Sequence, residues 1–216
     1  MRRLIFLSTG LAIGLFLISI SSFAQEVNYP KAEVFGGFSI SNVSLPFSSF
    51  DPTTGTLTSA RNTFWGWQGA ANYNLTHHLG LVADFGGQYK TVGGLVPVNS
   101  YQFLFGPRMA FRGPRMTPFV HAMFGGIKEG TGTFSITDPI LGTVNVPGAS
   151  STGFGMGLGG GIDINISDKL ALRVPQFDWM LVRESSIDPT TLLPTSIWNK
   201  SAIRIGIGLV FKAGQK

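Results

Sequence analysis

The chain has 216 residues, of which 44% are hydrophobic and only 12% are charged, and its formal net charge is +5 at pH 7. With 18 phenylalanines and 29 glycines, this composition excludes a disordered chain and is unusual for a soluble domain, which carries about a quarter charged residues. The absence of cysteine excludes a disulfide scaffold, a thiolate metal site and a cysteine nucleophile. The length suits a single domain.

Residues 1–24 have the pattern of a secretory signal peptide. Two arginines near the start precede an almost wholly apolar stretch, and Ser22-Phe23-Ala24 places small residues where signal peptidase cleaves. A retained membrane anchor is the alternative, but Gln25-Glu26 follows in place of a positive stop-transfer flank. We therefore expect cleavage after residue 24 and one mature domain over residues 25–216. Export also argues against a nucleic-acid partner.

The rest of the chain alternates apolar residues with polar or small ones at a period of two, which is typical of strands with two different faces. Eight stretches follow this pattern: residues 32–40, 65–73, 79–89, 101–111, 120–125, 153–165, 170–174 and 203–211. Roughly ten residues suit a tilted strand that crosses a bilayer. Pro175 interrupts the seventh stretch, so we expect a β-bulge at Pro175-Gln176 that returns Arg173 and Asp178 to one face.

The connections between these stretches alternate in length. Residues 75–78, 113–116 and 167–169 make tight turns, whereas residues 42–62, 90–99, 128–151 and 184–199 make longer loops. Short turns on one side and long loops on the other are typical of an outer-membrane barrel with periplasmic turns and external loops. The run from Thr131 to Ile136 predicts that the fifth and sixth strands continue outward beyond the membrane.

Alternation alone fits both a soluble barrel with an apolar interior and a membrane barrel with an apolar exterior. The polar face is rich in glycine, which suits the crowded interior of eight strands better than a solvent-facing surface. Aromatic residues gather toward the strand ends, as they do at the two membrane interfaces. These features favour the membrane barrel.

The charges on the polar face nearly balance, as an enclosed interior requires. They are Glu33, Asp84, Asp163 and Asp178 against Arg108, Arg173, Arg204 and the titratable His121. We therefore predict an all-β fold, an eight-stranded antiparallel up-and-down transmembrane β-barrel with short periplasmic turns and long external loops. Its location would be the bacterial outer membrane, with membrane lipids as its surroundings.

Four segments resemble the bacterial outer-membrane protein β-barrel domain of the OmpA/OmpX type: residues 79–87, Phe105-Gly106-Pro107-Arg108, residues 117–122 and residues 160–163. The resemblance covers essentially the whole mature chain and implies the outer-membrane insertion machinery as a partner. Phe211 matches the terminal aromatic residue that this machinery reads, although residues 212–216 follow it. No peptidoglycan-binding domain follows the barrel pattern, so a role in attachment to the cell wall cannot be carried over from the resemblance.

Three motifs have alternative chemical interpretations. Residues 155–160 match G-x-G-x-x-G, but strand alternation continues through them, whereas a dinucleotide site needs a following helix. His77-His78 has no third metal ligand nearby in sequence and fits a solvated turn. His121 would face the interior, where a lipid hydrolase would need a serine beside it. We expect no catalytic residue, cofactor or metal site.

The inward charged residues would form either a gate or a structural plug, and side chains fill the interior at eight strands, which favours the plug. The leading hypothesis is therefore a structural or surface-interaction protein, not an enzyme, whose external loop partner the sequence does not name. One alternative is a narrow pore or a lateral route for small solutes. The other is a lipid-modifying outer-membrane hydrolase that uses His121.

Overall fold

The computed structural model describes residues 29–51, 56–92, 94, 96–138, 142–187 and 194–215. The expected signal peptide, residues 1–24, lies outside these ranges and stays a prediction. The described residues form ten strands: β1 (Pro30–Asp51), β2 (Thr56–Asn74), β3 (Leu79–Val92), β4 (Val96–Ala110), β5 (Met116–Thr131), β6 (Phe134–Asp138), β7 (Gly142–Val146), β8 (Ser150–Ser167), β9 (Leu170–Ile187) and β10 (Pro194–Gln215). In these ranges, no helix is long and apolar enough to span a membrane.

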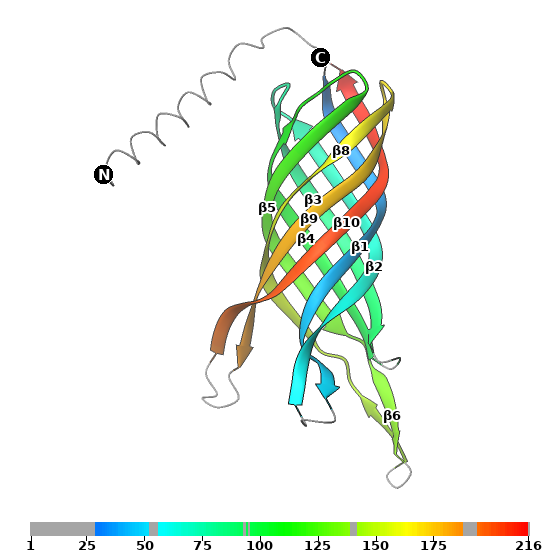
Figure 1. The fold of residues 1–216 in the computed structure, drawn as a ribbon, viewed down its shortest axis with the longest axis vertical. Coiled ribbons are helices and arrows are strands. Elements are labelled where there is room, and N and C mark those ends of the chain that lie inside the picture. The colour runs from blue at the N-terminus through cyan, green and yellow to red at the C-terminus, as the bar shows by residue number, and fades with distance from the viewer. Residues whose placement is uncertain are drawn as a thin grey trace, which may run out of the picture.

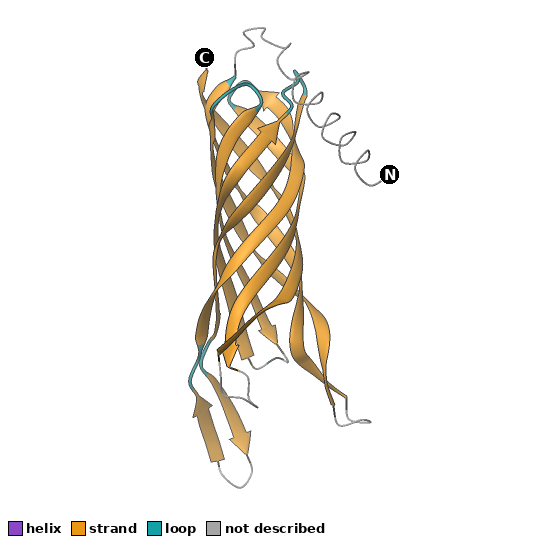
Figure 2. Cartoon of the chain, turned by 90° about the vertical axis from the view of Figure 1, so that its left-hand side faces the viewer, coloured by secondary structure: helices purple, strands orange, loops and turns teal. Residues whose placement is uncertain are grey.

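Eight of the strands close into one antiparallel barrel in the order β1-β10-β9-β8-β5-β4-β3-β2. The barrel closes where β1 pairs with β10, so that Phe38 lies between Ile207 on β10 and Trp67 on β2. Each barrel strand otherwise pairs with the barrel strand that precedes or follows it in the chain, as Figures 1 and 2 show. The predicted eight-stranded up-and-down barrel is confirmed.

The two ends of the barrel differ in the length of their connections. Residues 75–78, 111–115 and 168–169 are short turns, and they lie beside the chain ends at Pro30 and Gln215, at the top of Figure 1. We call this the periplasmic end and the opposite one the external end. The predicted arrangement of short turns and long connections is therefore confirmed.

The strands at the external end run further than the sequence pattern predicted. β1 continues to Asp51 and β2 starts at Thr56, so most of the expected loop 42–62 is paired strand. In the same way, β9 and β10 pair through Ile187 and Pro194. Backbone pairing needs no apolar face, so it can continue where alternation has ended. The long connections at this end are therefore largely extensions of the barrel strands.

The segment after β5 was also mispredicted. β5 ends at Thr131 and β8 starts at Ser150, while β6 and β7 form a separate two-stranded sheet beyond the external end of the barrel (Figures 1 and 2). Pro147 lies at the junction between this hairpin and β8, and proline has no amide hydrogen to donate to a ladder. The barrel strands therefore stop here, and the hairpin is a distinct element.

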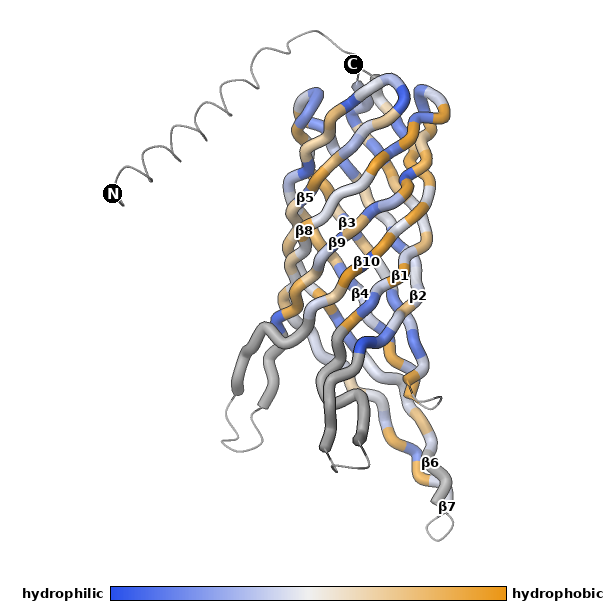
Figure 3. The backbone as a smooth tube through the Cα atoms, in the orientation of Figure 1, coloured by the Kyte–Doolittle hydropathy of each residue, from blue (hydrophilic) through white to orange (hydrophobic). Residues whose placement is uncertain are grey.

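The outer wall of the barrel is apolar, as the alternation predicted. Figure 3 shows hydrophobic and hydrophilic residues alternating along the strands. The exposed side chains include Phe38, Trp67, Leu81, Phe103, Phe105, Val120, Leu158, Phe177 and Ile205. In water such a continuous apolar surface would be unstable, whereas lipid is its proper solvent. The choice of a membrane barrel over a soluble one is therefore confirmed.

A β-bulge interrupts β9 close to the position that the sequence predicted. Arg173 pairs with Gly208 and Gln176 pairs with Gly206, so Val174 and Pro175 together lie opposite one residue of β10. The bulge begins one residue earlier than expected. Because of the extra residue, Arg173 and Asp178 both point into the interior although their sequence positions differ by an odd number.

Inward-facing glycines make room for the large polar side chains of other strands. A Cβ atom at Gly206 would lie 2.6 Å from Oε1 of Gln68, and one at Gly159 would lie 2.9 Å from Nε2 of His121. Both distances are shorter than van der Waals contact, so a larger residue would displace these groups. The high glycine content therefore reflects the crowding inside a barrel of eight strands.

Phe105 tests whether the outer wall faces lipid. Its side chain points outward from the middle of β4 and is 49% exposed. Phe105→Arg is expected to lower the free energy of unfolding by about 2–4 kcal/mol, the range for arginine near a bilayer midplane. Urea unfolding of protein folded into phospholipid vesicles measures this, with Phe105→Leu as the apolar control. Equal losses in both variants would contradict the lipid-facing assignment.

Candidate functional site in the bore of the barrel

The eight charged or titratable residues expected on the inner face all lie inside the barrel. Their exposed fractions are 6% for His121 and 2% or less for Glu33, Asp84, Arg108, Asp163, Arg173, Asp178 and Arg204. They come from seven of the eight barrel strands, with β2 as the exception. Charged side chains this deeply buried need partners, because desolvation costs several kcal/mol per ion.

Toward the periplasmic end, Asp163 on β8 holds two arginines. Arg173 makes a bidentate contact with it, with Nε 2.7 Å from Oδ1 and Nη2 3.0 Å from Oδ2. Arg108 places Nη2 2.9 Å from Oδ2 of Asp163 and its Nη1 donates to Oε2 of Glu33. Charge-assisted bonds of this kind are roughly twice as strong as neutral ones. Strands β1, β4, β8 and β9 are thus joined across the bore.

Aromatic rings pack against the same two arginines. The ring centroid of Phe119 lies 4.3 Å from Cζ of both Arg108 and Arg173. Phe35 lies 4.5 Å from Cζ of Arg173. At these distances the ring faces attract the cations, and more strongly where water is excluded. The rings therefore stabilise the guanidinium groups where these are not bonded to carboxylates.

Deeper in the bore, Arg204 on β10 joins two aspartates from opposite sides. Its Nη1 lies 2.8 Å from Oδ1 of Asp84, and its Nη2 lies 2.6 Å from Oδ2 of Asp178. Gln68 donates to Oδ2 of Asp84 at 2.6 Å, and Nε2 of His121 lies 2.7 Å from Oδ1 of Asp178. Arg204 and its two carboxylates are almost completely buried.

Gln176, next to the bulge, connects the two groups of charges. Its Oε1 accepts from Nη1 of Arg173 at 3.1 Å, and its Nε2 donates to Oδ2 of Asp178 at 2.8 Å. All eight expected residues therefore belong to one connected set of ion pairs and hydrogen bonds. We call this set, with Gln68, Gln176, Asn74 and Arg112, the bore network.

Arg112 is the most important member that the sequence analysis missed. Its Nη2 lies 3.0 Å from Oε1 of Glu33, which also accepts from Nδ2 of Asn74 at 3.1 Å. With Arg112 the network contains four carboxylates and four guanidinium groups, so its charges balance without a proton on His121. The sequence does place Arg112 on the same face as Arg108, because the two positions differ by an even number. Arg112 lies beyond the end of β4, however, where the alternation was not followed.

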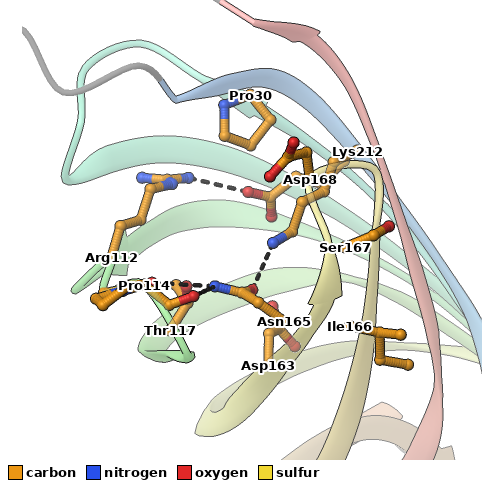
Figure 4. A pocket seen from close by; sticks show the side chains of 12 residues that line it. Pro30, Arg112, Pro114, Thr117, Asp163, Asn165, Ile166, Ser167, Asp168 and Lys212 are labelled. Atoms are coloured by element: carbon orange, nitrogen blue, oxygen red, sulfur yellow. Dashed lines mark hydrogen bonds and ion pairs between the residues drawn. The ribbon is translucent and has the colours of Figure 1, made fainter.

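A cavity of about 640 Å³ opens at the periplasmic end. Figure 4 shows Arg112, Asn165 and Lys212 around it, with Nζ of Lys212 donating to Oδ1 of Asn165 at 2.6 Å. Glu33 and Asp163 of the bore network also line it, so the cavity reaches the network from one side. On the external side, apolar side chains fill much of the bore; they are Leu104, Met123, Ile127, Met180 and Val182.

Comparison with known protein families identifies the family of this chain. The sequence profile of the family "Outer membrane protein beta-barrel domain" matches residues 10–211. The chain belongs to this family. The resemblance inferred from the sequence is thus confirmed, and the protein is an outer-membrane barrel of bacteria that lies in a lipid environment. Comparison with curated protein sequences gives no significant match.

Solved structures share the fold at low sequence identity. Ail, the attachment invasion locus protein of Yersinia pestis, is 11% identical with a TM-score of 0.52, and the alignment covers 85% of this chain and 98% of Ail. Neisserial surface protein A is 12% identical with a TM-score of 0.56, covering 84% and 97%. At such identities the likeness concerns the fold, and function rests on the site.

The structure gives no support to the hydrolase alternative. The recorded hydrogen bond of the His121 ring is to Asp178, and in the described ranges no serine is bonded to that ring. The glycine motif at residues 155–160 lies inside β8, as the alternation predicted, with no helix after it. In the same ranges, no group of three or more His, Cys, Asp or Glu side chains could hold a metal ion.

Substitution of Arg204 tests how much the bore network contributes to the stability of the barrel. Arg204→Leu removes the partner of Asp84 and Asp178, and an uncompensated buried charge is expected to cost about 3–5 kcal/mol of unfolding free energy. The control is Arg115→Leu in an exposed periplasmic turn, for which we expect a change within about 0.5 kcal/mol. Urea unfolding in vesicles measures both. A loss for Arg204→Leu no larger than that for the control would show that the network contributes little.

Proposed function

We propose that this outer-membrane barrel is a non-catalytic surface protein, in which a closed bore forms the rigid base for external elements that contact the surroundings. The observation that carries this proposal is the bore network. It joins strands on opposite sides of the barrel, as when Arg204 on β10 reaches Asp84 on β3. Its charges are matched inside the barrel, so they need no ligand or ion from outside.

A closed bore follows from the same contacts. The interior of eight strands is just wide enough for side chains to fill. An ion that crossed the network would have to separate pairs such as Arg173 and Asp163, which form two bonds at 2.7 and 3.0 Å. It would then meet the apolar side chains of Leu104 and Met123, where hydration is lost. Both steps are costly, which supports a plug over a channel.

The external end offers the surface for interaction. β1, β2, β9 and β10 extend to the external end, and the β6–β7 hairpin stands beyond it (Figure 1). Binding residues are commonly carried on such projecting segments above a rigid scaffold. Two proteins of similar fold are named attachment invasion locus protein and surface protein, and these names also support a role in contacts at the cell surface.

A narrow pore is the second candidate, and the periplasmic cavity is the observation that favours it. This cavity of about 640 Å³ already leads from the periplasmic end to Glu33 and Asp163. A rearrangement of the bore network would be needed to continue the path outward. Conductance measurements distinguish the two candidates, because a pore gives steady openings of the native protein and a plugged bore does not.

In planar bilayers, the native protein is expected to show no steady conductance. The double variant Glu33→Ala/Arg108→Ala removes one negative and one positive charge from the network and shortens both side chains. It should open more often than the native protein, but only briefly, because the ion pairs of Arg204 and apolar side chains such as Leu104 still obstruct the bore. Arg115→Ala, which alters an exposed turn, should stay silent like the native protein. Steady openings of the native protein would contradict the plug and support the pore.

We also infer that the outer-membrane insertion machinery assembles this barrel after export and removal of residues 1–24. A basic start, an apolar stretch and Ser22-Phe23-Ala24 support cleavage. The mature domain would then comprise residues 25–216. Mass spectrometry of the protein from outer membranes should find Gln25 as the first residue. A chain that keeps its apolar N-terminal segment would show a retained anchor in place of a signal peptide.

A further inference from the structure

The turn between β2 and β3 holds two consecutive histidines that the proposed function does not use. In a strand, consecutive side chains point to opposite faces, so neighbouring residues do not meet. Here the chain turns, and Nδ1 of His77 lies 3.4 Å from Nε2 of His78. The two rings are nearly perpendicular, at 89°, with centroids 4.6 Å apart. Two ring nitrogens thus face each other at the periplasmic end.

The backbone of β4 determines which nitrogen of His78 carries its proton. Nδ1 of His78 lies 3.1 Å from the carbonyl oxygen of Ala110. A carbonyl oxygen only accepts, so Nδ1 is the protonated nitrogen of a neutral His78 and Nε2 presents its lone pair to His77. Histidines that bind metals commonly donate their other N–H to a carbonyl in this way, which orients the ring.

Without a bound cation, neither neutral tautomer of His77 satisfies all of the ring nitrogens. If Nδ1 of His77 carries the proton, it donates to His78, and Nε2 of His77 is a buried acceptor without a hydrogen-bond partner among the described residues. If Nε2 carries the proton, two lone pairs face each other at 3.4 Å. A cation bound to both nitrogens, to one side of the line that joins them, would satisfy both lone pairs, with the proton of His77 on Nε2. Their separation matches the edge of a tetrahedral site, about 3.4 Å for ligands 2.0–2.1 Å from zinc.

The surroundings leave the pair accessible. Arg112 donates to the backbone oxygen of His77 and pairs with Glu33, and its charge is balanced within the bore network. Both histidine rings are partly exposed, which leaves a path for an ion from the periplasm.

We propose that His77 and His78 form a two-histidine site for a divalent transition-metal ion of the zinc type, with water completing the coordination. Imidazole nitrogen suits zinc and copper, whereas magnesium and calcium prefer oxygen ligands. The site has two protein ligands because no third candidate side chain joins them in the described ranges. Metal binding would also stabilise the turn whose carbonyl holds Arg112, and thereby the adjoining part of the bore network.

The test uses the full-length protein from outer membranes, in detergent micelles and without a polyhistidine tag. Isothermal titration with zinc chloride should show one site, which an excess of magnesium leaves unchanged. His77→Ala and His78→Ala should each weaken zinc binding by at least about tenfold, as loss of a ligand or its support does. The control is Lys169→Ala in another periplasmic turn, which should bind zinc like the native protein.

Copper provides a second measurement that identifies the ligands. The electron paramagnetic resonance spectrum of the native protein with one equivalent of Cu²⁺ should show two coordinating imidazole nitrogens, and each single variant should show at most one. Slower electrophoretic mobility after boiling checks that every variant remains a folded barrel. Equal zinc affinity in the native protein and the double variant His77→Ala/His78→Ala would overturn the proposal, as would the absence of binding. Neither result depends on whether the barrel conducts.

Discussion

Pairing of buried charge inside the bore is the interaction on which the rest of this barrel depends. Each ion in the interior has lost water, and only a partner within bonding distance compensates that loss. Arg204 finds its partners on β3 and β9, strands that are distant from one another around the wall. A shift of one residue in a strand that carries one of these charged side chains would turn that side chain into lipid. The bore network therefore selects the register of the strands.

The same requirement explains the division of residue sizes between the two faces. Large polar side chains fit inside a narrow barrel only where the opposing positions are small, as at Gly159 beside His121 and Gly206 beside Gln68. Bulky apolar residues such as Phe105 are placed outside, where lipid accommodates them. The glycine and phenylalanine contents are thus two consequences of one geometry: a bore that is crowded and an outer wall that is not.

The assignment of residues to the inner and outer faces could be predicted from the sequence, because the alternation of apolar and polar residues shows which face a side chain occupies. The alternation does not show how far along the barrel axis a side chain lies. The contact between Asp84 and Arg204, 120 residues apart, could therefore not be predicted. Arg112 was missed because it lies just past the last paired residue of β4. The external extensions to Asp51 and Ile187 were missed because paired strands outside lipid need no apolar face.

The two ends of the molecule are consequently under different constraints. At the periplasmic end, Arg112 bonds both to Glu33 inside the bore and to the backbone of His77, so the short turn and the bore network form one structure. A displacement of the His77 carbonyl would therefore disturb the contact between Arg112 and Glu33. At the external end, the β6–β7 hairpin pairs with itself and belongs to a separate sheet. Its sequence can therefore change with little cost to the barrel, which is the freedom that a surface-interaction role requires.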